Sequence, residues 1–303
     1  MEPTKPKLPS EAIELYNLFI HGVISRRAFM DGVQRFAVGG LAAAAMIEAL
    51  MPNYAQAQQV SKSDDRIKAT YETVPSPQGN GSIKGYLVRP ASADTRSETP
   101  TKLPGVIVVH ENRGLNPHIE DVARRFALLN FMAFAPDGLT SLGGFPGDDY
   151  KGGQMFGKVD GKKMTEDFVA SAMWLKSRAD CSGKIGITGF CYGGGISNTM
   201  GVRLGTDLAA AAPFYGGVPA DGDIPKIKAA ILVHHGALDT RLAATWPAYD
   251  TALKATNVPH EGYIYPGAVH GFHCDATPER YNKAAAELAW QRTIDWFNKY
   301  VRV

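Results

Sequence analysis

Short apolar runs alternate with longer amphipathic stretches along most of the chain. Residues 105–110, 131–135, 184–188 and 229–234 are continuous apolar runs, typical of parallel strands buried on both faces. Three shorter patterns, at 67–73, 83–88 and 262–265, predict further strands. The spacing of apolar residues within 164–175 and 284–300 predicts helices between and after them. Strands that alternate with helices indicate an α/β fold, with a mostly parallel central sheet and helices on both faces.

The first 57 residues have a different pattern. Arg26 and Arg27 precede an uncharged stretch at 36–45, and Ala-Gln-Ala follows at 55–57. This combination is typical of a twin-arginine export signal, and it places the α/β domain at residues 58–303. The uncharged stretch is too short to cross a bilayer, so we expect no stable membrane anchor.

The same N-terminal segment also has apolar residues at helical spacing. They are Ala12, Ile13, Leu15, Tyr16, Leu18 and Phe19. Such a face predicts instead a helical arm that packs on the body or on a second copy of the chain. Export to the periplasm is the favoured hypothesis, whereas a retained arm would leave the protein in the cytoplasm and offer a surface for a homo-oligomer.

Composition excludes several classes of protein. Hydrophobic residues make up 45% of the 303 and charged residues 20%, as in an ordinary globular protein. The 32 basic and 30 acidic residues give a formal net charge of +2, without a long run of either sign, so no nucleic-acid partner is expected. Three cysteines without CxxC spacing argue against a disulfide framework and against a zinc finger.

The strongest chemical signal is Gly-Phe-Cys-Tyr-Gly at 189–193, between a predicted strand and a predicted helix. This is the pattern of a nucleophile elbow with Cys191 in place of serine. So sharp a turn leaves no room for side chains two residues before and after the nucleophile. The helix N-terminus is expected to lower the pKa of the Cys191 thiol, and the N–H of Tyr192 to hold an oxyanion.

Two polar residues follow the elbow in the order that a catalytic triad requires. Asp239 lies just after the strand at 229–234, and His270 follows the strand at 262–265. We expect both at the carboxyl edge of the sheet, where His270 would take the thiol proton and Asp239 would orient its imidazole. Singly, Asp239 could cap a helix that begins near Arg241, and His270 could be an ordinary loop histidine. Together with the elbow they predict a Cys-His-Asp triad.

The loop His-Glu-Asn-Arg-Gly at 110–114 follows the first buried strand at the same edge. By position, the N–H of Asn112 is the second oxyanion donor. Glu111 either holds the thiol inactive until substrate displaces it or pairs with Arg113. The glycine-rich loop 142–149 is expected to form part of the pocket wall. A solvated helix face is predicted for Glu120, Asp121, Arg124 and Arg125, the last being a weaker candidate for a buried ion pair.

A metal site and a redox function are the alternatives to consider. His234, His235, His273 and Cys274 lie outside any recognised zinc signature, and His234 is expected to point into the core, so we expect neither metal nor cofactor. A thiol redox protein would need Cys274 to resolve Cys191, because Cys181 precedes the elbow strand and belongs at the opposite sheet edge. A protein that only binds its ligand would need no base aligned on a thiol.

With these motifs, residues from about 67 to 303 resemble the dienelactone hydrolase family of α/β-hydrolases. The resemblance rests on residues 110–114, 189–194 and 266–272 and on the turn at Asp239. It implies hydrolysis of small activated esters or lactones through a thioester acyl-enzyme, with Glu111 gating the cysteine.

The resemblance does not extend to the arginine that binds the carboxylate of dienelactone. In the family this arginine closely follows the catalytic histidine, whereas Gly-Phe-His-Cys follows His270 here. Arg is not interchangeable with His in a bidentate carboxylate contact. His273, Arg113 and Arg241 are the candidate substrate-binding residues in its place.

Overall fold

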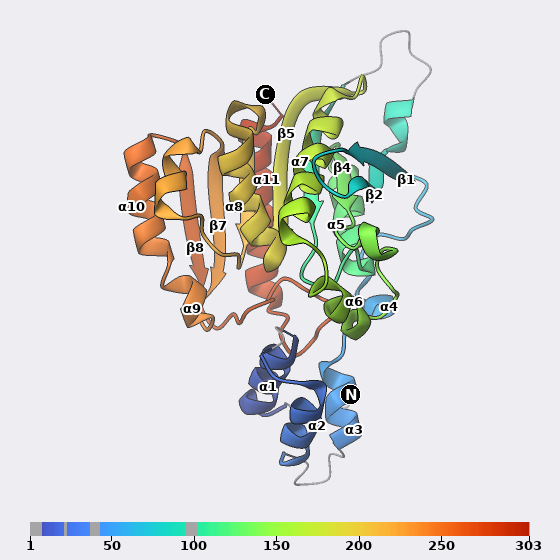
Figure 1. The fold of residues 1–303 in the computed structure, drawn as a ribbon, viewed down its shortest axis with the longest axis vertical. Helices are drawn as coiled ribbons and strands as arrows, with labels where there is room; N and C mark the ends of the chain where they lie inside the picture. The colour runs from blue at the N-terminus through green and yellow to red at the C-terminus, as the bar shows by residue number, and fades with distance from the viewer. Residues whose placement is uncertain (1–7, 21–22, 37–42, 95–101, 303) are drawn as a thin grey trace.

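The computed structural model describes residues 8–20, 23–36, 43–94 and 102–302, and its body is built on an eight-stranded sheet (Figure 1). The strands are β1 (Ile67–Ser76), β2 (Gly81–Pro90), β3 (Leu103–Val109), β4 (Met132–Pro136), β5 (Cys181–Phe190), β6 (Ala210–Phe214), β7 (Ala230–Gly236) and β8 (His260–Tyr265). The helices are α1 (Ser10–Ile20), α2 (Arg26–Gln34), α3 (Ala43–Leu50), α4 (Tyr54–Ala57), α5 (Pro117–Leu128), α6 (Asp149–Phe156), α7 (Gly161–Ser177), α8 (Tyr192–Leu204), α9 (Thr240–Ala243), α10 (Trp246–Thr256) and α11 (Lys283–Tyr300).

The strands lie in the order β1-β2-β4-β3-β5-β6-β7-β8. β2 is antiparallel to both of its neighbours, and the remaining pairs are parallel. The sequence predicted all of these strands except β6, whose segment Ala-Ala-Ala-Pro-Phe has small residues and a proline instead of a β-branched run. β6 is a strand because it lies buried between β5 and β7, which supply its partners.

Helices cover both faces of the sheet, as predicted. α5 and α11 pack on one face, where Phe126 and Phe297 belong to one buried apolar cluster. α7, α8 and α10 pack on the other face, where Phe168 and Leu253 belong to a second cluster. Because strands β3 to β8 are parallel, their carboxyl ends meet at one edge, the lower edge in Figure 1. The loops with candidate catalytic residues leave the sheet there.

Helices α1 to α3 form a small bundle below this edge, which we call the N-terminal cap (Figure 1). The bundle has its own apolar core, which includes Tyr16, Phe29 and Leu50. Arg26 and Arg27 are exposed in the first turn of α2. Residues 37–42 of the predicted uncharged stretch lie outside the described residues. In the part of the chain that the structure describes, no helix has both the length and the apolar character to span a membrane.

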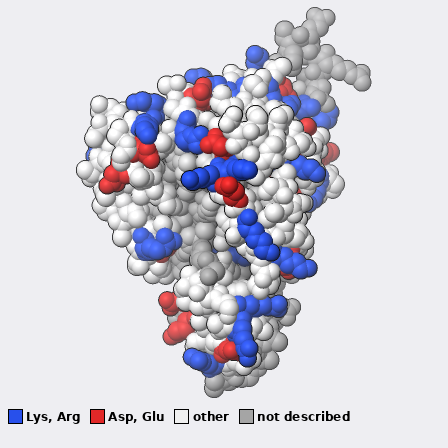
Figure 2. All heavy atoms as spheres, in the orientation of Figure 1, with Lys and Arg blue, Asp and Glu red and all other residues white. Residues whose placement is uncertain are grey.

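Charged side chains are spread over both the body and the cap. On the face that Figure 2 shows, the Lys and Arg side chains are interspersed with Asp and Glu. This face therefore offers no broad surface of a single sign, which agrees with the small formal net charge of +2.

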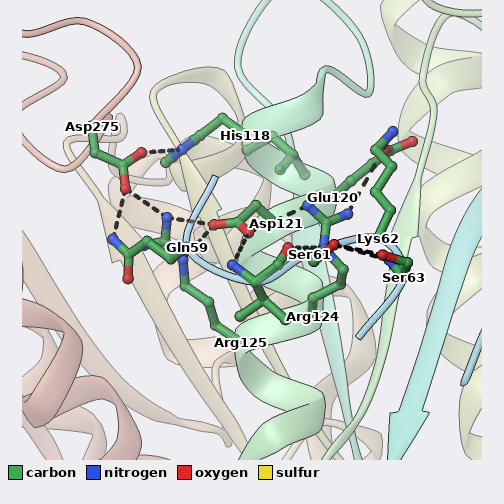
Figure 3. A network of polar contacts seen from close by, with 12 residues as sticks. Gln59, Ser61, Lys62, Ser63, His118, Glu120, Asp121, Arg124, Arg125 and Asp275 are labelled. Atoms are coloured by element: carbon green, nitrogen blue, oxygen red, sulfur yellow. Dashed lines mark hydrogen bonds and ion pairs between the residues drawn. The ribbon is translucent and has the colours of Figure 1, made fainter. Parts of the chain in front are cut away.

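The charged residues of α5 correct the prediction of a solvated face. Asp121 and Arg124 are 1% and 0% exposed, because residues 59–63 cross this side of the helix (Figure 3). The Val60 N–H donates to Asp121 Oδ1 at 2.8 Å, and Arg124 Nε donates to the Val60 carbonyl at 2.8 Å. Helical periodicity predicts which residues share a face, but it cannot show that a distant segment covers that face.

Candidate active site

The segment around Cys191 has the geometry of a nucleophile elbow. β5 ends one residue before Cys191, which has φ 56° and ψ −110°, and α8 begins one residue after it. A Cβ at Gly189 would lie 2.2 Å from the carbonyl oxygen of Gly193, and a Cβ at Gly193 would lie 2.3 Å from that of Val109. Both glycines are therefore required by close backbone approach. The turn leaves Cys191 half-buried at the N-terminus of α8.

Asp239 and His270 meet at the same edge although 31 positions separate them. His270 Nδ1 lies 2.6 Å from Asp239 Oδ2, and both side chains are nearly buried. Asp239 precedes α9, but its side chain makes no capping hydrogen bond to that helix. Burial raises the pKa of Asp239, but the hydrogen bond and charge of His270 outweigh it and leave the pKa lowered. The carboxylate thus faces the imidazole.

His270 lies between this carboxylate and the thiol. Burial lowers its pKa, but the charge of Cys191 and hydrogen bonds to Asp239 and Cys191 outweigh burial and raise the pKa to about 9. Below that pH, His270 holds two protons, one for each partner. The sulfur, the imidazole and the carboxylate therefore form a hydrogen-bonded row suited to proton transfer.

Glu111 lies buried next to this row, with 8% of its surface exposed. Burial raises its pKa, but the positive charges of Arg280, Arg113 and His270 outweigh it and leave the pKa lowered. Glu111 is thus kept as a carboxylate by a group of cations and not by Arg113 alone. The strongest of these charges, Arg280, was not among the site residues predicted from the sequence.

Arg280 lies on the connection between His270 and α11, and only 4% of it is exposed. Its guanidinium packs against Gly271, where φ is 81° and an added Cβ would lie 2.8 Å from Arg280 Nη1. The sequence signal for Arg280 is weak. It consists of a long connection without a predicted helix or strand, which returns across the carboxyl edge of the sheet. Arg280 was not predicted as a site residue because it lies ten positions after His270 in the sequence.

Tyr215 is a second residue that the sequence did not reveal. It follows β6, the strand that was missed, and has φ 36° with 1% of its surface exposed. Its ring centroid lies 5.0 Å from that of His270, and its buried hydroxyl has no hydrogen-bond partner among the described residues. Positive φ at a buried tyrosine is uncommon, and residues with such backbone strain cluster at functional sites.

Arg113 and Asn112 lie where the loop after β3 meets the N-terminal cap. Arg113 is buried, with Nη1 at 3.8 Å from Asp149 Oδ2. Asn112 Nδ2 donates to the carbonyl of Ile20 at 3.0 Å. Both line a cleft of about 510 Å³ between the cap and α6. Of the loop 142–149, only Asp149 is among the residues that line this cleft.

The other two candidate substrate-binding residues lie elsewhere. His273 is 2% exposed and stacks on Phe190 with ring centroids 4.9 Å apart, below the elbow. Burial holds its pKa well below the usual range, so it is a neutral core residue and we do not retain it as a substrate-binding residue. Arg241 is exposed on α9, where its charge helps to lower the pKa of Asp239.

A polar network anchors the loop that follows His270. Asp275 accepts hydrogen bonds from Arg125 Nη2 at 2.6 Å and Gln59 Nε2 at 2.7 Å, and its Oδ1 lies 3.0 Å from His118 Nδ1 (Figure 3). Arg125 also pairs with Asp121 at 2.6 Å. The ion pairs of Arg125, a residue predicted to form one, therefore connect α5 to the loop that follows His270.

The histidines and thiols considered for a metal or for redox chemistry are dispersed. Among the described residues, no group of three or more His, Cys, Asp or Glu side chains is placed to hold a metal ion. His234 is buried, with Nδ1 2.9 Å from the Tyr265 hydroxyl and Nε2 3.0 Å from Thr293 Oγ1. Cys274 is buried as a free thiol, and burial raises its pKa to about 12. Such a thiol is poorly suited to resolve a disulfide.

The sheet and the loops at its carboxyl edge define an α/β-hydrolase. A sequence model described as the Dienelactone hydrolase family matches residues 83–301, and the chain belongs to that family of hydrolases. The Escherichia coli (strain K12) protein named "Putative carboxymethylenebutenolidase" is 33% identical over 257 residues, covering 80% of this chain and 90% of that protein.

Two further similarities cover different shares of the chain. A second protein of Escherichia coli (strain K12), named "Putative hydrolase fragment YghX", is 52% identical over 120 residues, 40% of this chain and 97% of that protein. The solved structure of the dienelactone hydrolase-like promiscuous phosphotriesterase P91, from metagenomic libraries, has a TM-score of 0.62 and 25% identity, covering 77% of this chain and 98% of that one.

Proposed function

We propose that the chain is a cysteine-dependent hydrolase of small activated esters or lactones that acts through a thioester acyl-enzyme. The observation that carries the proposal is the row of Cys191, His270 and Asp239, in which His270 has a pKa of about 9. A hydrogen-bonded histidine with a raised pKa favours the ion pair in which it carries the proton of the neighbouring thiol. The sulfur is then a thiolate at a helix N-terminus, where thiolates are most stable.

The reaction then follows in two halves. The Cys191 sulfur attacks the ester carbonyl, and His270 gives its proton to the departing alkoxide as the carbon–oxygen bond breaks. Water attacks the resulting thioester, His270 takes a proton from it, and the sulfur leaves. The Tyr192 and Asn112 N–H groups are the proposed donors to the oxyanion in both halves. Asp239 holds the imidazole in the tautomer that this requires.

A pre-steady-state experiment tests the proposal. The purified protein is mixed with a panel of p-nitrophenyl esters and with dienelactone, and released product is followed from the first milliseconds. We expect a burst of about one equivalent of p-nitrophenolate and an acyl group on the peptide that contains Cys191 in the mass spectrum. If Cys191 is reactive but the protein turns over none of these compounds, the proposed hydrolase activity is refuted, and the result points to thiol redox chemistry.

Glu111 is proposed to restrain the thiol until substrate is bound. Glu111 is buried with its pKa lowered, and such a carboxylate disfavours a second negative charge on a nearby sulfur. The variant Glu111→Gln removes this charge while keeping the shape of the side chain. We expect faster alkylation of Cys191 by iodoacetamide and an altered pH–rate profile for ester hydrolysis. Glu261→Gln, on β8 and outside the site, is the matched control. If Glu111→Gln changes neither the rate of alkylation nor the pH–rate profile, Glu111 has no role in the mechanism.

A further inference from the structure

The N-terminal cap and the segment just after it are attached to three elements at the carboxyl edge of the sheet. The Ile20 carbonyl at the end of α1 accepts a hydrogen bond from Asn112, in the loop after β3. Just after the cap, the Tyr54 hydroxyl donates to Asp149 of α6 at 2.7 Å, and the Asn53 N–H donates to the Ala276 carbonyl at 2.6 Å. Ala276 belongs to the loop that follows His270, so the cap and the segment just after it together contact both sides of the site.

A tyrosine of the cap also reaches the arginine that faces Glu111. Tyr16 is 1% exposed, and the Arg280 guanidinium lies 5.3 Å from the centre of its ring. Cation–π contacts of this kind gain strength when water is excluded. The positive charges of Arg113 and Arg280 also act on the Tyr16 hydroxyl and oppose the rise in its pKa that burial causes. The cap is thus packed against the charged centre of the site.

The cleft of about 510 Å³ lies where the cap meets α6. Its apolar walls are Phe19, Ile20 and Ile24 from the cap and Tyr150 and Phe156 from α6. Phe19 and Tyr150 stack across the junction, with ring centroids 5.6 Å apart and an interplanar angle of 20°. The volume is within the range of small-molecule sites in proteins, about 300–1,000 Å³.

Two residues of the cleft wall lead toward the elbow and toward Glu111. Phe156, in its wall, packs edge-on against Tyr192 at 4.7 Å, and Tyr192 directly follows Cys191. Asn112, also in the wall, directly follows Glu111. Arg113 lines the cleft as well, and its buried Nη2 has no hydrogen-bond partner among the described residues. The lining of the cleft thus includes a donor for an oxygen together with aromatic walls.

We propose that the cap is the outer wall of the substrate site and that the cleft binds an aromatic-sized apolar group of the ester, on its acyl or its alcohol side. This inference rests on the proposed function and extends it to the substrate class. Esters with one such group would be preferred over the smallest esters because only they fill the space between Phe19 and Phe156. The N-terminal segment would then determine specificity in the folded enzyme.

The full-length variant Gln154→Trp tests the proposal, because Gln154 is exposed at the cleft and a tryptophan there would fill it. Lys151→Trp, on the same helix but outside the cleft lining, is the matched control. The substrates are vinyl acetate, which is small on both sides, vinyl phenylacetate, with a large acyl group, and phenyl acetate, with a large alcohol. We expect Gln154→Trp to lower kcat/KM at least about 10-fold for one of the two large esters and to leave vinyl acetate within about twofold.

Equal effects of Gln154→Trp on all three esters, or none on any, would overturn the proposal, as would the same pattern in Lys151→Trp. A second readout needs no hydrolysis: alkylation of Cys191 by phenacyl bromide is compared with alkylation by iodoacetamide. Gln154→Trp is expected to slow only the larger reagent, and an unchanged ratio of the two rates would contradict the assignment. Absence of turnover in the unmodified chain would refute the proposed function, whereas the alkylation ratio would still test the cleft.

Discussion

Cys191→Ala is expected to abolish the p-nitrophenolate burst and to lower kcat/KM for activated esters by about 10⁴-fold or more, because removing the nucleophile of a triad leaves only the oxyanion donors and binding. The variant should keep the fold. Alanine is smaller than cysteine, and it inherits the φ of 56° that the elbow already imposes. The measurement is stopped-flow and steady-state hydrolysis, together with thermal unfolding of both proteins.

The other two thiols supply the controls. Cys181 is buried at the start of β5, at the end of the strand away from the elbow, and Cys181→Ala should leave the burst intact. Cys274→Ala separates the hydrolase from a redox protein, because a resolving thiol would be essential for thiol exchange and dispensable for ester hydrolysis. A burst that survives in Cys191→Ala would eliminate cysteine catalysis.

The second large effect is expected for Asp239→Asn, which should lower kcat by about 10³- to 10⁴-fold, as loss of the orienting carboxylate does in other triads. The change also removes a negative charge and a hydrogen bond that raise the pKa of His270. The protonated imidazole is lost as the pH rises through about 9 in the unmodified chain. With asparagine at this position, that loss occurs at lower pH, so the alkaline limb of kcat/KM moves to lower pH.

The pH dependence of kcat/KM between about pH 5 and 10 measures this shift directly. Asp250→Asn is a suitable control, because Asp250 pairs with Lys254 at 2.5 Å on the surface of α10 and lies outside the site. A profile of Asp239→Asn with its alkaline limb in the original position would mean that another group sets the charge of His270.

The sequence predicted that Asp239 and His270 meet at the edge of the elbow because the parts of this candidate site are encoded locally. The two glycines of the elbow are required by backbone approaches of 2.2 and 2.3 Å, and a strand and a helix next to them complete the motif. Asp239 and His270 each follow a strand, and parallel strands bring their carboxyl ends to one edge. β6 was missed because its strand conformation depends on neighbours and not on its own residues.

By itself, the sequence determined the fold class and the family, and it singled out Cys191, His270 and Asp239 as candidates for the nucleophile, the base and its orienting acid, since each depends on a short motif and on chain order. Only the tertiary structure placed Arg280 beside Glu111 and brought the N-terminal cap over the catalytic edge. It also buried the charged face of α5 beneath residues 59–63. These contacts join segments far apart in the chain. Their energies come from burial and charge pairing, which depend on which surfaces meet and leave no periodic pattern in the sequence.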